Sequence, residues 1–294
     1  MLCAMSTQPS NQLNPVFACI ISACSWGVLW YPLRLLQKNG VDGLWATLLI
    51  YSVAIFTVFK PCWQKRHSFS ENYWLYFLLA LTSGWTNLAF ILAMLSSEVV
   101  RVLLLFFLSP IWAIIMARII LHEKFTLSTL LSLIIAITGA LLMLWQDGLL
   151  QQGLSTSDIY ALSSGFAFAL TNIVVRKLGV IHWSKKIGAA WLGVVVISIS
   201  GIIITQNMNF PEINQYSLLL IIFTAFPFMF VMTWMAQYGV THLPIRISSI
   251  IFLLEILAGA LSAVWLTNEV IHERELIGGI FIVIAGIVSV WKKQ

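Results

Sequence analysis

Charge is scarce in this sequence. Only 9% of the 294 residues are Asp, Glu, Lys or Arg, whereas 60% are hydrophobic. Soluble domains carry roughly 25% charged residues, and a soluble fold could not hide this much apolar surface from water. The mean hydropathy of +0.93 therefore indicates that lipid is the solvent for most of the chain. The basic residues are scattered through short connections and form no patch, so nothing suggests a nucleic-acid partner.

Several chemical signatures are also missing. The four cysteines, Cys3, Cys19, Cys24 and Cys62, form no CxxC pair and have no His or Asp at ligand spacing. They therefore indicate small apolar core positions, with neither a disulfide framework nor a metal site. The sequence contains no GxxxxGK[ST] and no HExxH, so no nucleotide-driven pump, zinc enzyme or cofactor is expected. Residues 1–14 contain no Lys or Arg, which is unlike a secretory signal.

The sequence contains ten apolar runs. A transmembrane helix needs about 20 residues, with a range of ~17–25, and each run is at or close to that length. The runs are Pro15–Leu36, Leu44–Phe59, Tyr73–Met94, Val99–Leu121, Leu127–Trp145, Ile159–Val175, Ile187–Thr205, Ser217–Tyr238, Ile245–Leu266 and Leu276–Trp291. Lys60-Pro61 is expected to end the second span. The pattern predicts an all-α membrane protein with ten transmembrane helices.

The second half of the chain repeats the first. Phe106–Glu123 (FFLSPIWAIIMARIILHE) returns as Phe252–Glu269 (FLLEILAGALSAVWLTNE), so that Phe106 falls on Phe252. The polar stretch Gln146–Asp158 separates five runs from five. Because five is odd, the second copy enters the membrane from the opposite side. We therefore expect two inverted five-helix repeats, residues 15–146 (spans 1–5) and 156–291 (spans 6–10), as in many transporters.

The repeated motif resembles a known family. LSPIWAIIMARIILHEK, followed by an apolar run with Gly139 inside it, resembles the EamA family of the drug/metabolite transporter superfamily. The second copy, with Gly286 downstream, and the opening SACSWG of the first span are similar to it too. The resemblance covers nearly the whole chain. One departure is that the family usually has proline in both copies, whereas Pro110 has Ile256 as its counterpart. The ninth span is therefore expected to be straighter than the fourth.

The resemblance implies a secondary transporter that exports or exchanges small metabolites, such as amino acids, through a central cavity between the halves. The expected setting is a bacterial inner membrane, the expected partners are a small-molecule substrate and the lipid bilayer, and the protein would be a monomer or a homodimer. The alternative is a membrane-embedded enzyme or a non-transporting scaffold with the same architecture, although no catalytic residue set supports the enzyme.

Glu255 is the most informative candidate residue. It lies about eleven residues beyond Pro244, hence about 16 Å along the ninth span at ~1.5 Å per residue. A carboxylate at this depth is costly, so it should face the protein interior and have a partner. We expect it to line the cavity next to the substrate, with possible proton coupling there; the alternative is a structural hydrogen bond from Asn87 or Tyr31. Further candidate substrate-site residues are Ser109, Asn87, Asn172, Trp30, Tyr31, Trp234, Gln237 and Tyr238.

Three more residues have expected mechanical roles. Pro110 lies inside an apolar run, where it removes a backbone hydrogen bond and can kink the helix. Arg101 and Arg246 occupy nearly equivalent places in the two copies and are expected to gate opposite mouths of one cavity. The alternative for both arginines is that they extend to the lipid headgroups, and Arg101 could also pair with Glu98.

Both termini are predicted to be cytoplasmic. With that orientation, 12 of the 16 Lys and Arg residues lie in cytoplasmic segments and 4 in external ones, as positive residues prefer the inside. A cysteine replacing Gln152, in a chain without its native cysteines, should then react with an impermeant thiol reagent in whole cells. Labelling only after lysis would contradict this topology.

Overall fold

The computed structural model describes residues 13–64, 72–96, 99–145, 154–267 and 272–291. Ten helical segments in this part of the chain are long and apolar enough to cross a membrane, and its regular elements are all helices. The expectation of an all-α protein with ten spans is therefore confirmed. Gln152, chosen above as a labelling site, and Glu98 lie outside the described residues.

The spans are, in chain order, α1 (Pro15–Val28) with α2 (Trp30–Lys38), α3 (Gly43–Gln64), α4 (Tyr73–Ser96), α5 (Val99–Phe106) with α6 (Ser109–Ile120), α7 (Leu127–Leu144), α8 (Thr156–Leu178), α9 (Trp183–Ile204), α10 (Gln215–Phe223) with the π-helical segment η2 (Thr224–Met229) and α11 (Phe230–His242), α12 (Ile245–Phe252) with α13 (Leu254–Thr267), and α14 (Glu273–Trp291). Four of the ten spans are thus divided into consecutive helical segments.

Several helices are longer than their apolar runs. The sixth span has 23 residues and the seventh 22, because polar and basic residues at the membrane surface continue each helix beyond its apolar middle. The expectation that Lys60-Pro61 ends the second span is wrong, since Pro61 lies inside α3 and the helix continues to Gln64. A proline removes only one hydrogen bond, and in the last turn of a span this does not stop the helix.

Short polar side chains begin many of the helices. The side chains of Asn14, Thr126 and Asn214 accept backbone N–H groups of the first turns of α1, α7 and α10. Asp42 does the same for α3, with 2.9 Å between its Oδ1 and the nitrogen of Leu44. These caps satisfy amides that have no partner inside the helix, so they fix where the chain enters the membrane.

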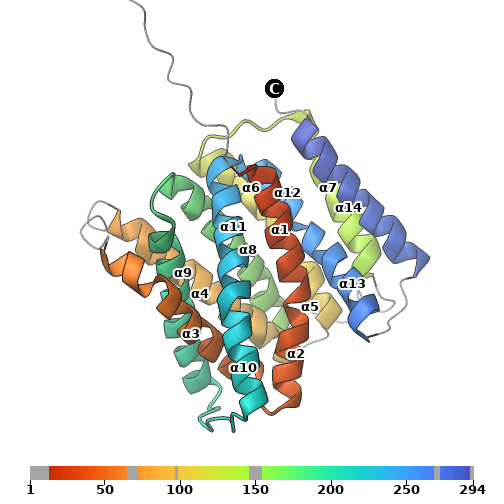
Figure 1. Cartoon of the computed structure of the whole chain (residues 1–294). Helices are drawn as coiled ribbons and strands as arrows, with labels where there is room; N and C mark the ends of the chain where they lie inside the picture. The colour runs from red at the N-terminus through yellow and green to blue at the C-terminus, as the bar shows by residue number, and fades with distance from the viewer. Residues whose placement is uncertain (1–12, 65–71, 97–98, 146–153, 268–271, 292–294) are drawn as a thin grey trace, which may run out of the picture.

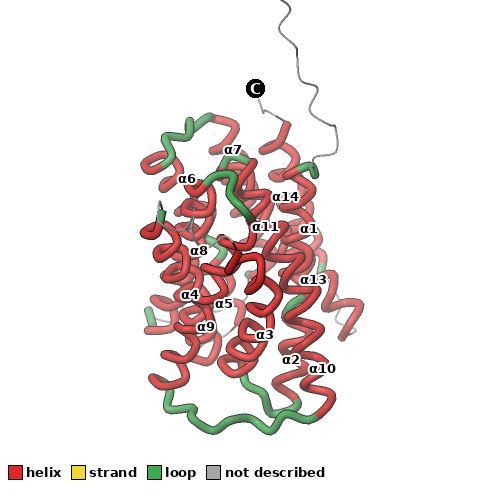
Figure 2. The backbone as a smooth tube through the Cα atoms, turned by 60° about the vertical axis from the view of Figure 1, so that its left-hand side comes forward, coloured by secondary structure: helices red, strands yellow, loops and turns green. Residues whose placement is uncertain are grey.

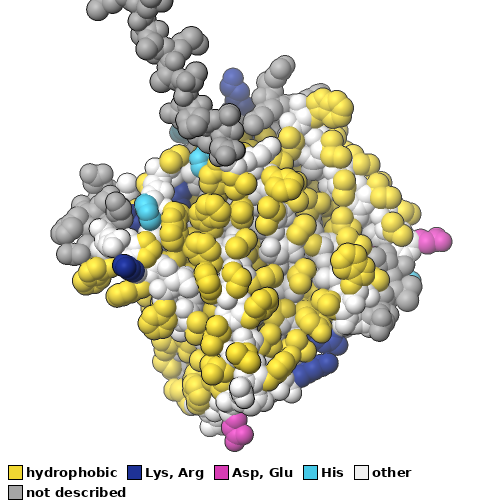
Figure 3. All heavy atoms as spheres, in the orientation of Figure 1, with side chains coloured by type: hydrophobic (Ala, Val, Ile, Leu, Met, Phe, Trp, Pro, Cys, Tyr) yellow, Lys and Arg dark blue, Asp and Glu magenta, His cyan; other side chains and the backbone are white. Residues whose placement is uncertain are grey.

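The spans run along one common direction (Figure 2). The start of α1 and the end of α14 lie at the same end of the bundle (Figure 1), called here the terminal end, and the connection between α9 and α10 crosses the opposite end (Figure 2). Hydrophobic side chains cover most of the face drawn in Figure 3, with the charged groups around its margin. Trp63, Tyr73 and Trp74 are exposed near the terminal end, and Phe210 and Tyr216 near the opposite end, as expected for aromatic residues at a membrane surface.

The packing of the spans places α7 and α14 side by side at one edge of the bundle (Figure 1). The first span, α1–α2, packs against α11 and against α12–α13, and α8 packs against α4 and against α5–α6. Span one therefore contacts the third and fourth spans of the second half, and span six contacts the third and fourth spans of the first half. Buried apolar residues from both halves fill one cluster, which includes Cys19, Ala113, Ile173 and Ile251.

Two glycines allow α7 and α14 to touch through their backbones. A Cβ atom built on Gly139 would lie 2.6 Å from the carbonyl oxygen of Gly278, and one built on Gly278 would lie 2.5 Å from the carbonyl oxygen of Gly139. Side chains at either position would push the helices apart. In lipid, close approach of backbones is a main source of helix association.

Gly139→Ala should therefore lower the stability of the purified protein by about 1–3 kcal/mol, because the added methyl group overpacks the contact. Gly286→Ala is the matched control, since a Cβ there meets nothing within 4 Å and alanine is the better helix former. Thermal unfolding in detergent would compare the two variants. Equal melting temperatures would show that the glycine contact does not hold this edge together.

Candidate functional site

The fourth and ninth spans are interrupted at equivalent positions. Helix α5 ends at Phe106 and α12 ends at Phe252, the two residues that the sequence repeat superposes. At each interruption the backbone turns more tightly: the N–H of Ile111 donates to the carbonyl of Leu108 and the N–H of Ile256 to that of Leu253, one residue closer than in an α-helix. Interrupted helices near the bilayer centre are typical of substrate sites in transporters.

This finding corrects one expectation. The ninth span was expected to be the straighter one because it lacks proline, but it is interrupted as the fourth is. Pro110 lies in the first turn of α6, directly after the break, where a missing N–H costs nothing. The proline therefore fits the interruption but is not required for it, since Ile256 follows the equivalent break in the ninth span.

Three phenylalanines meet at the interruptions. The ring of Phe168 on α8 lies between those of Phe106 and Phe252, with centroid distances of 5.6 and 6.0 Å. Phe106 and Phe252 are buried. We call Phe106, Phe168 and Phe252 the phenylalanine layer. It joins both halves of the chain near the middle of the membrane.

Glu255 lies just beyond this layer, on the side of the opposite end. It is in the first turn of α13, about 4.5 Å from Phe252 along the span at ~1.5 Å per residue. It shares a helix face with Gly259 and Ser262, and this face packs against α1: a Cβ built on Gly27 would lie 2.8 Å from the nitrogen of Gly259. The carboxyl group is half-buried, and no hydrogen bond or ion pair joins it to another described residue.

No hydrogen bond joins Glu255 to Asn87 or Tyr31, its expected alternative partners. Asn87 donates from Nδ2 to the carbonyl of Ser83, 3.0 Å away, and accepts from the hydroxyl of Tyr51 at 3.5 Å. Its side chain thus bridges α3 and α4. Tyr31 contacts the ring of Trp30 edge-on, with 5.5 Å between the centroids.

Polar side chains also lie on the other side of the phenylalanine layer. Ser109 is about 4.5 Å beyond Phe106 and Asn172 about 6 Å beyond Phe168, both toward the terminal end, at ~1.5 Å per residue. Ser109, Asn172 and Gln237 have exposed fractions of only 5%, 8% and 9%. The side chains of all three make no hydrogen bond within the described part of the chain, and the Oε1 atom of Gln237 is fully buried.

Asn172 and Gln237 lie at the same depth on neighbouring helices. A guanidinium N–H of Arg176 donates to the carbonyl of Thr241, which links α8 to α11. Asn172 is one turn before Arg176, and Gln237 is one turn before Thr241, on the same side of this link. Buried polar groups are normally hydrogen-bonded, so unpartnered ones beside an interrupted helix indicate places that a ligand or water would occupy.

Trp30 lies on the same side of the phenylalanine layer as Glu255. Its Nε1 donates to the hydroxyl of Ser262 at 2.9 Å, and that hydroxyl lies 3.3 Å from the carbonyl of Gly27. This contact joins the first and ninth spans, one from each half. Trp234 and Tyr238, two other expected site residues, lie near each other on α11 with tilted rings whose centroids are 6.1 Å apart. The hydroxyl of Tyr238 donates to the carbonyl of Leu13.

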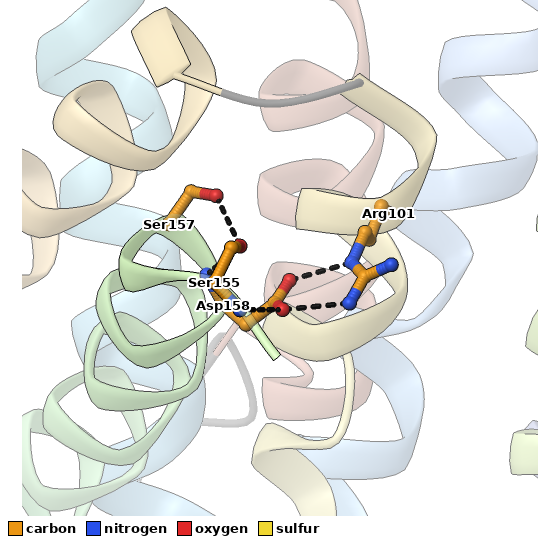
Figure 4. Close-up of polar contacts among 4 residues, drawn as sticks. All are labelled: Arg101, Ser155, Ser157 and Asp158. Atoms are coloured by element: carbon orange, nitrogen blue, oxygen red, sulfur yellow. Dashed lines mark hydrogen bonds and ion pairs between the residues drawn. The ribbon is translucent and has the colours of Figure 1, made fainter. Parts of the chain in front are cut away.

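The partner of Arg101 is Asp158. The Nε and Nη2 atoms of the guanidinium donate to the two carboxylate oxygens at 2.6 and 2.7 Å (Figure 4). The pair joins α5 to the first turn of α8, and thus one half to the other, at the opposite end of the bundle. Asp158 also accepts the N–H of Ser155 at 2.8 Å, while Ser155 caps α8 in return. Both side chains are largely buried, with exposed fractions of 11% and 2%.

Sequence reasoning missed Asp158, because it placed this residue at the edge of the polar connection between the halves. The signal that could have identified it is the spacing Ser155-x-x-Asp158 before an apolar run. This spacing is typical of a capping box, in which a serine and an acidic residue satisfy each other's backbone amides. It would have predicted an ordered helix start at Asp158, close to the start of the fourth span.

Arg246 is placed differently from Arg101. It is half-buried at the start of α12, where it lines a cavity of about 10 Å³ with Thr126, Ser128 and Thr129. No hydrogen bond or ion pair joins it to another described residue. The link between halves at this terminal end is instead Glu123, whose Oε1 accepts the N–H of Ile245 at 3.0 Å.

A buried lysine at the terminal end was also missed. Lys186, with an exposed fraction of 3%, donates from Nζ to the carbonyls of Val175 and Gly179 and to the hydroxyl of Thr241, at 3.1, 2.6 and 2.6 Å. Its three N–H donors are therefore satisfied by the end of α8 and by α11. A cation at a helix C-terminus is favourable, so Lys186 supports the fold there and is not available to a ligand.

Comparison with known proteins agrees with this architecture. Residues 13–145 match the model of the EamA-like transporter family. An uncharacterized transporter of Archaeoglobus fulgidus is 24% identical over 73% of this chain and 75% of its own length. Protein RarD of Escherichia coli and of Salmonella typhi are 27% and 28% identical, over 53% of this chain and 52% of each relative.

A solved crystal structure has the same fold. It superposes with a TM-score of 0.79, covers 94% of this chain and 97% of its own, and is 11% identical in sequence. Likeness at this identity concerns the fold alone. Evidence for transport comes instead from the family model and from the Archaeoglobus fulgidus relative, which is a transporter by name. The resemblance recognised from the sequence is thus confirmed over residues 13–145, and the chain is a multi-pass membrane transporter similar to that family.

Proposed function

We propose that the chain is a secondary transporter that exports or exchanges small metabolites, such as amino acids, by alternating access. The observation that carries this proposal is the pair of interruptions at Phe106 and Phe252, with unpartnered polar groups on both sides of the phenylalanine layer. A substrate would exchange contacts with Glu255 on one side for contacts with Ser109, Asn172 and Gln237 on the other.

An inverted repeat of residues 15–146 and 156–291 is part of the proposal. The packing of the spans supports it, because exchanging each span with the one five places along the chain leaves the main contacts unchanged. Span one meets spans eight and nine, and span six meets spans three and four. Spans two and seven pack together, as do four with nine and five with ten. Two similar units of this kind can rock against each other to open one mouth at a time.

We further propose that the terminal end faces the cytoplasm of a bacterial cell and that the protein lies in the inner membrane. Arg176, Lys177, Lys185 and Lys186 lie toward the terminal end, beside the connection between α8 and α9. This excess of positive charge supports the orientation. The Arg101–Asp158 pair then closes the external mouth, and Arg246 with Glu123 marks the cytoplasmic one.

Glu255 is proposed to couple transport to a proton. A lone carboxylate in a medium of low polarity is destabilised unless a cation approaches it or a proton neutralises it. Alternating access would expose it to either side in turn, so that it could bind a proton from one side and release it to the other. The half-buried carboxyl group without a partner supports this role.

Vesicles that contain the purified protein should take up members of a panel of labelled amino acids and amines, and empty vesicles should not. In this assay Glu255→Gln should abolish the dependence of uptake on a pH gradient, since glutamine keeps the shape but cannot titrate. Arg246→Ala, at the mouth, should change the rate of uptake but not its pH dependence. A Glu255→Gln variant with an unchanged rate and pH profile would show that Glu255 has a structural role. If the vesicles took up no solute at all, the alternative of a non-transporting scaffold would be favoured.

The Arg101–Asp158 pair should matter for stability as well as for gating. Asp158→Asn keeps a capping side chain but loses the charge, and breaking a buried pair costs about 3–5 kcal/mol. Ser155→Ala removes only the cap and should cost about 1 kcal/mol. Thermal unfolding would rank the two, and a cysteine-labelling assay at the external mouth should show greater access in the Asp158 variant. Equal losses for both variants would argue against the ion pair as a closure.

A further inference from the structure

Within the described part of the membrane interior, one acidic side chain has no basic partner. Among the described acidic residues, Glu255 alone lies in the middle of a span. The others are in connections or within a turn of a helix end: Asp42, Glu123, Asp158, Glu212, Glu273 and Glu275. The cations close to the two halves' interface are engaged or distant. Arg101 is bound to Asp158, Lys186 is satisfied by oxygen atoms of α8 and α11, and Arg246 lies at the start of α12.

We propose that the site selects a small organic ammonium ion with an apolar body, and that Glu255 is its counter-ion. This narrows the substrates of the transport proposed above to amines without a carboxylate, in place of the amino acids named there. It rests on the proposed transport for the word substrate, whereas the binding itself does not depend on transport. A buried carboxylate is stable when a cation forms hydrogen bonds to it. Since no described residue supplies that cation, the ligand is the remaining source.

The hydrogen-bonding groups beside Glu255 also favour an ammonium ligand. Both oxygens of an ionised Glu255 are acceptors, and no described residue donates a hydrogen bond to them. An ammonium group has three donors and no acceptor, so it complements these atoms. A carboxylate ligand would need donors beside Glu255 instead. The donors of Arg101 and Lys186 are already directed to protein oxygens, the amides of Asn172 and Gln237 lie on the other side of the phenylalanine layer, and Arg246 lies at the start of α12.

Aromatic side chains suit the body of such a ligand. Trp30 lies one turn beyond Gly27, and Gly27 packs against the Glu255 face of α13. The guanidinium of Arg34 lies over the ring of Trp30, 5.9 Å from its centroid. The phenylalanine layer lies on the other side of Glu255. The distance from Glu255 to the depth of Ser109 is about 9 Å at ~1.5 Å per residue, which suits a small apolar or single-ring body.

Four probes that share a phenyl body test this selectivity: phenethylamine, 2-phenylethanol, 3-phenylpropionate and phenylalanine. Each is titrated against the full chain purified in detergent, and binding is followed by thermal shift and calorimetry. Phenethylamine should bind at least ~10-fold more tightly than the alcohol or the acid, because a hydrogen bond to a charged group is worth roughly 1.5–3 kcal/mol. A second set, butylamine, butanol and butyrate, controls for the fit of the ring.

The variants assign the preference to one carboxylate. Glu255→Gln should weaken amine binding about 10- to 100-fold and leave the alcohol unchanged, whereas Glu255→Asp should keep the order amine before alcohol even if it binds less tightly. Glu212→Gln is the matched control, because this carboxylate is exposed in a connection, and it should change nothing. The aspartate variant keeps the test readable if the glutamine variant folds poorly.

The outcomes separate this inference from the proposed function. No preference for the amine in either probe set, tighter binding of the acid, or an amine preference that survives Glu255→Gln would overturn it. Tightest binding of phenylalanine would overturn it as well, since a zwitterion needs a carboxylate site. If amine binding depends on Glu255 but vesicles take up no solute, the amine selectivity is supported and the proposed transport is contradicted. If vesicles take up solutes regardless of their charge, the transport is supported and the amine selectivity is contradicted.

Discussion

The structure depends on one constraint, which is that a backbone N–H or C=O inside lipid must find a partner within the protein. Ten spans meet it as helices, and short polar side chains such as Asn14 and Thr126 satisfy the first amides of the helices they begin. The interruptions at Phe106 and Phe252 meet it differently. They occur where other helices cover the chain, and tighter hydrogen bonds to Leu108 and Leu253 replace the regular ones. At these two breaks, irregular backbone is confined to the place where the two halves meet.

That confinement explains why the unpartnered polar side chains lie where they do. Glu255 and Ser109 are within three residues of an interruption, and Asn172 is one turn from Phe168, which fills the space between the breaks. Other polar groups in the spans are paired: Asn87 with Tyr51, Trp30 with Ser262, and Arg101 with Asp158. These pairs hold helices together, whereas the groups beside the phenylalanine layer are left for a ligand or water.

The sequence predicted the class, the number of spans and the two repeated motifs, because apolar length and internal repetition are local properties. It also identified Glu255 as an unusual residue from depth alone. It could not reveal the break in the ninth span, since Ile256 carries no signal of the kind that Pro110 does and the break follows from packing against α8. Nor could it pair Arg101 with Asp158, which are 57 positions apart. Asn87 was selected by the same depth argument as Glu255, yet a tyrosine on a neighbouring helix satisfies it.

The spans at the edge of the bundle are shorter than those at its other side. Helix α7 has 18 residues and α14 has 19, whereas α3 and α9 have 22 each. At ~1.5 Å per residue these lengths correspond to about 27–29 Å and about 33 Å. The extra length of α9 comes from polar and basic residues that continue the helix beyond its apolar run, and α3 continues past Lys60 and Pro61. These two helices therefore project further into the headgroup layer than α7 and α14, so that the two sides of the bundle differ in how much of that layer they displace.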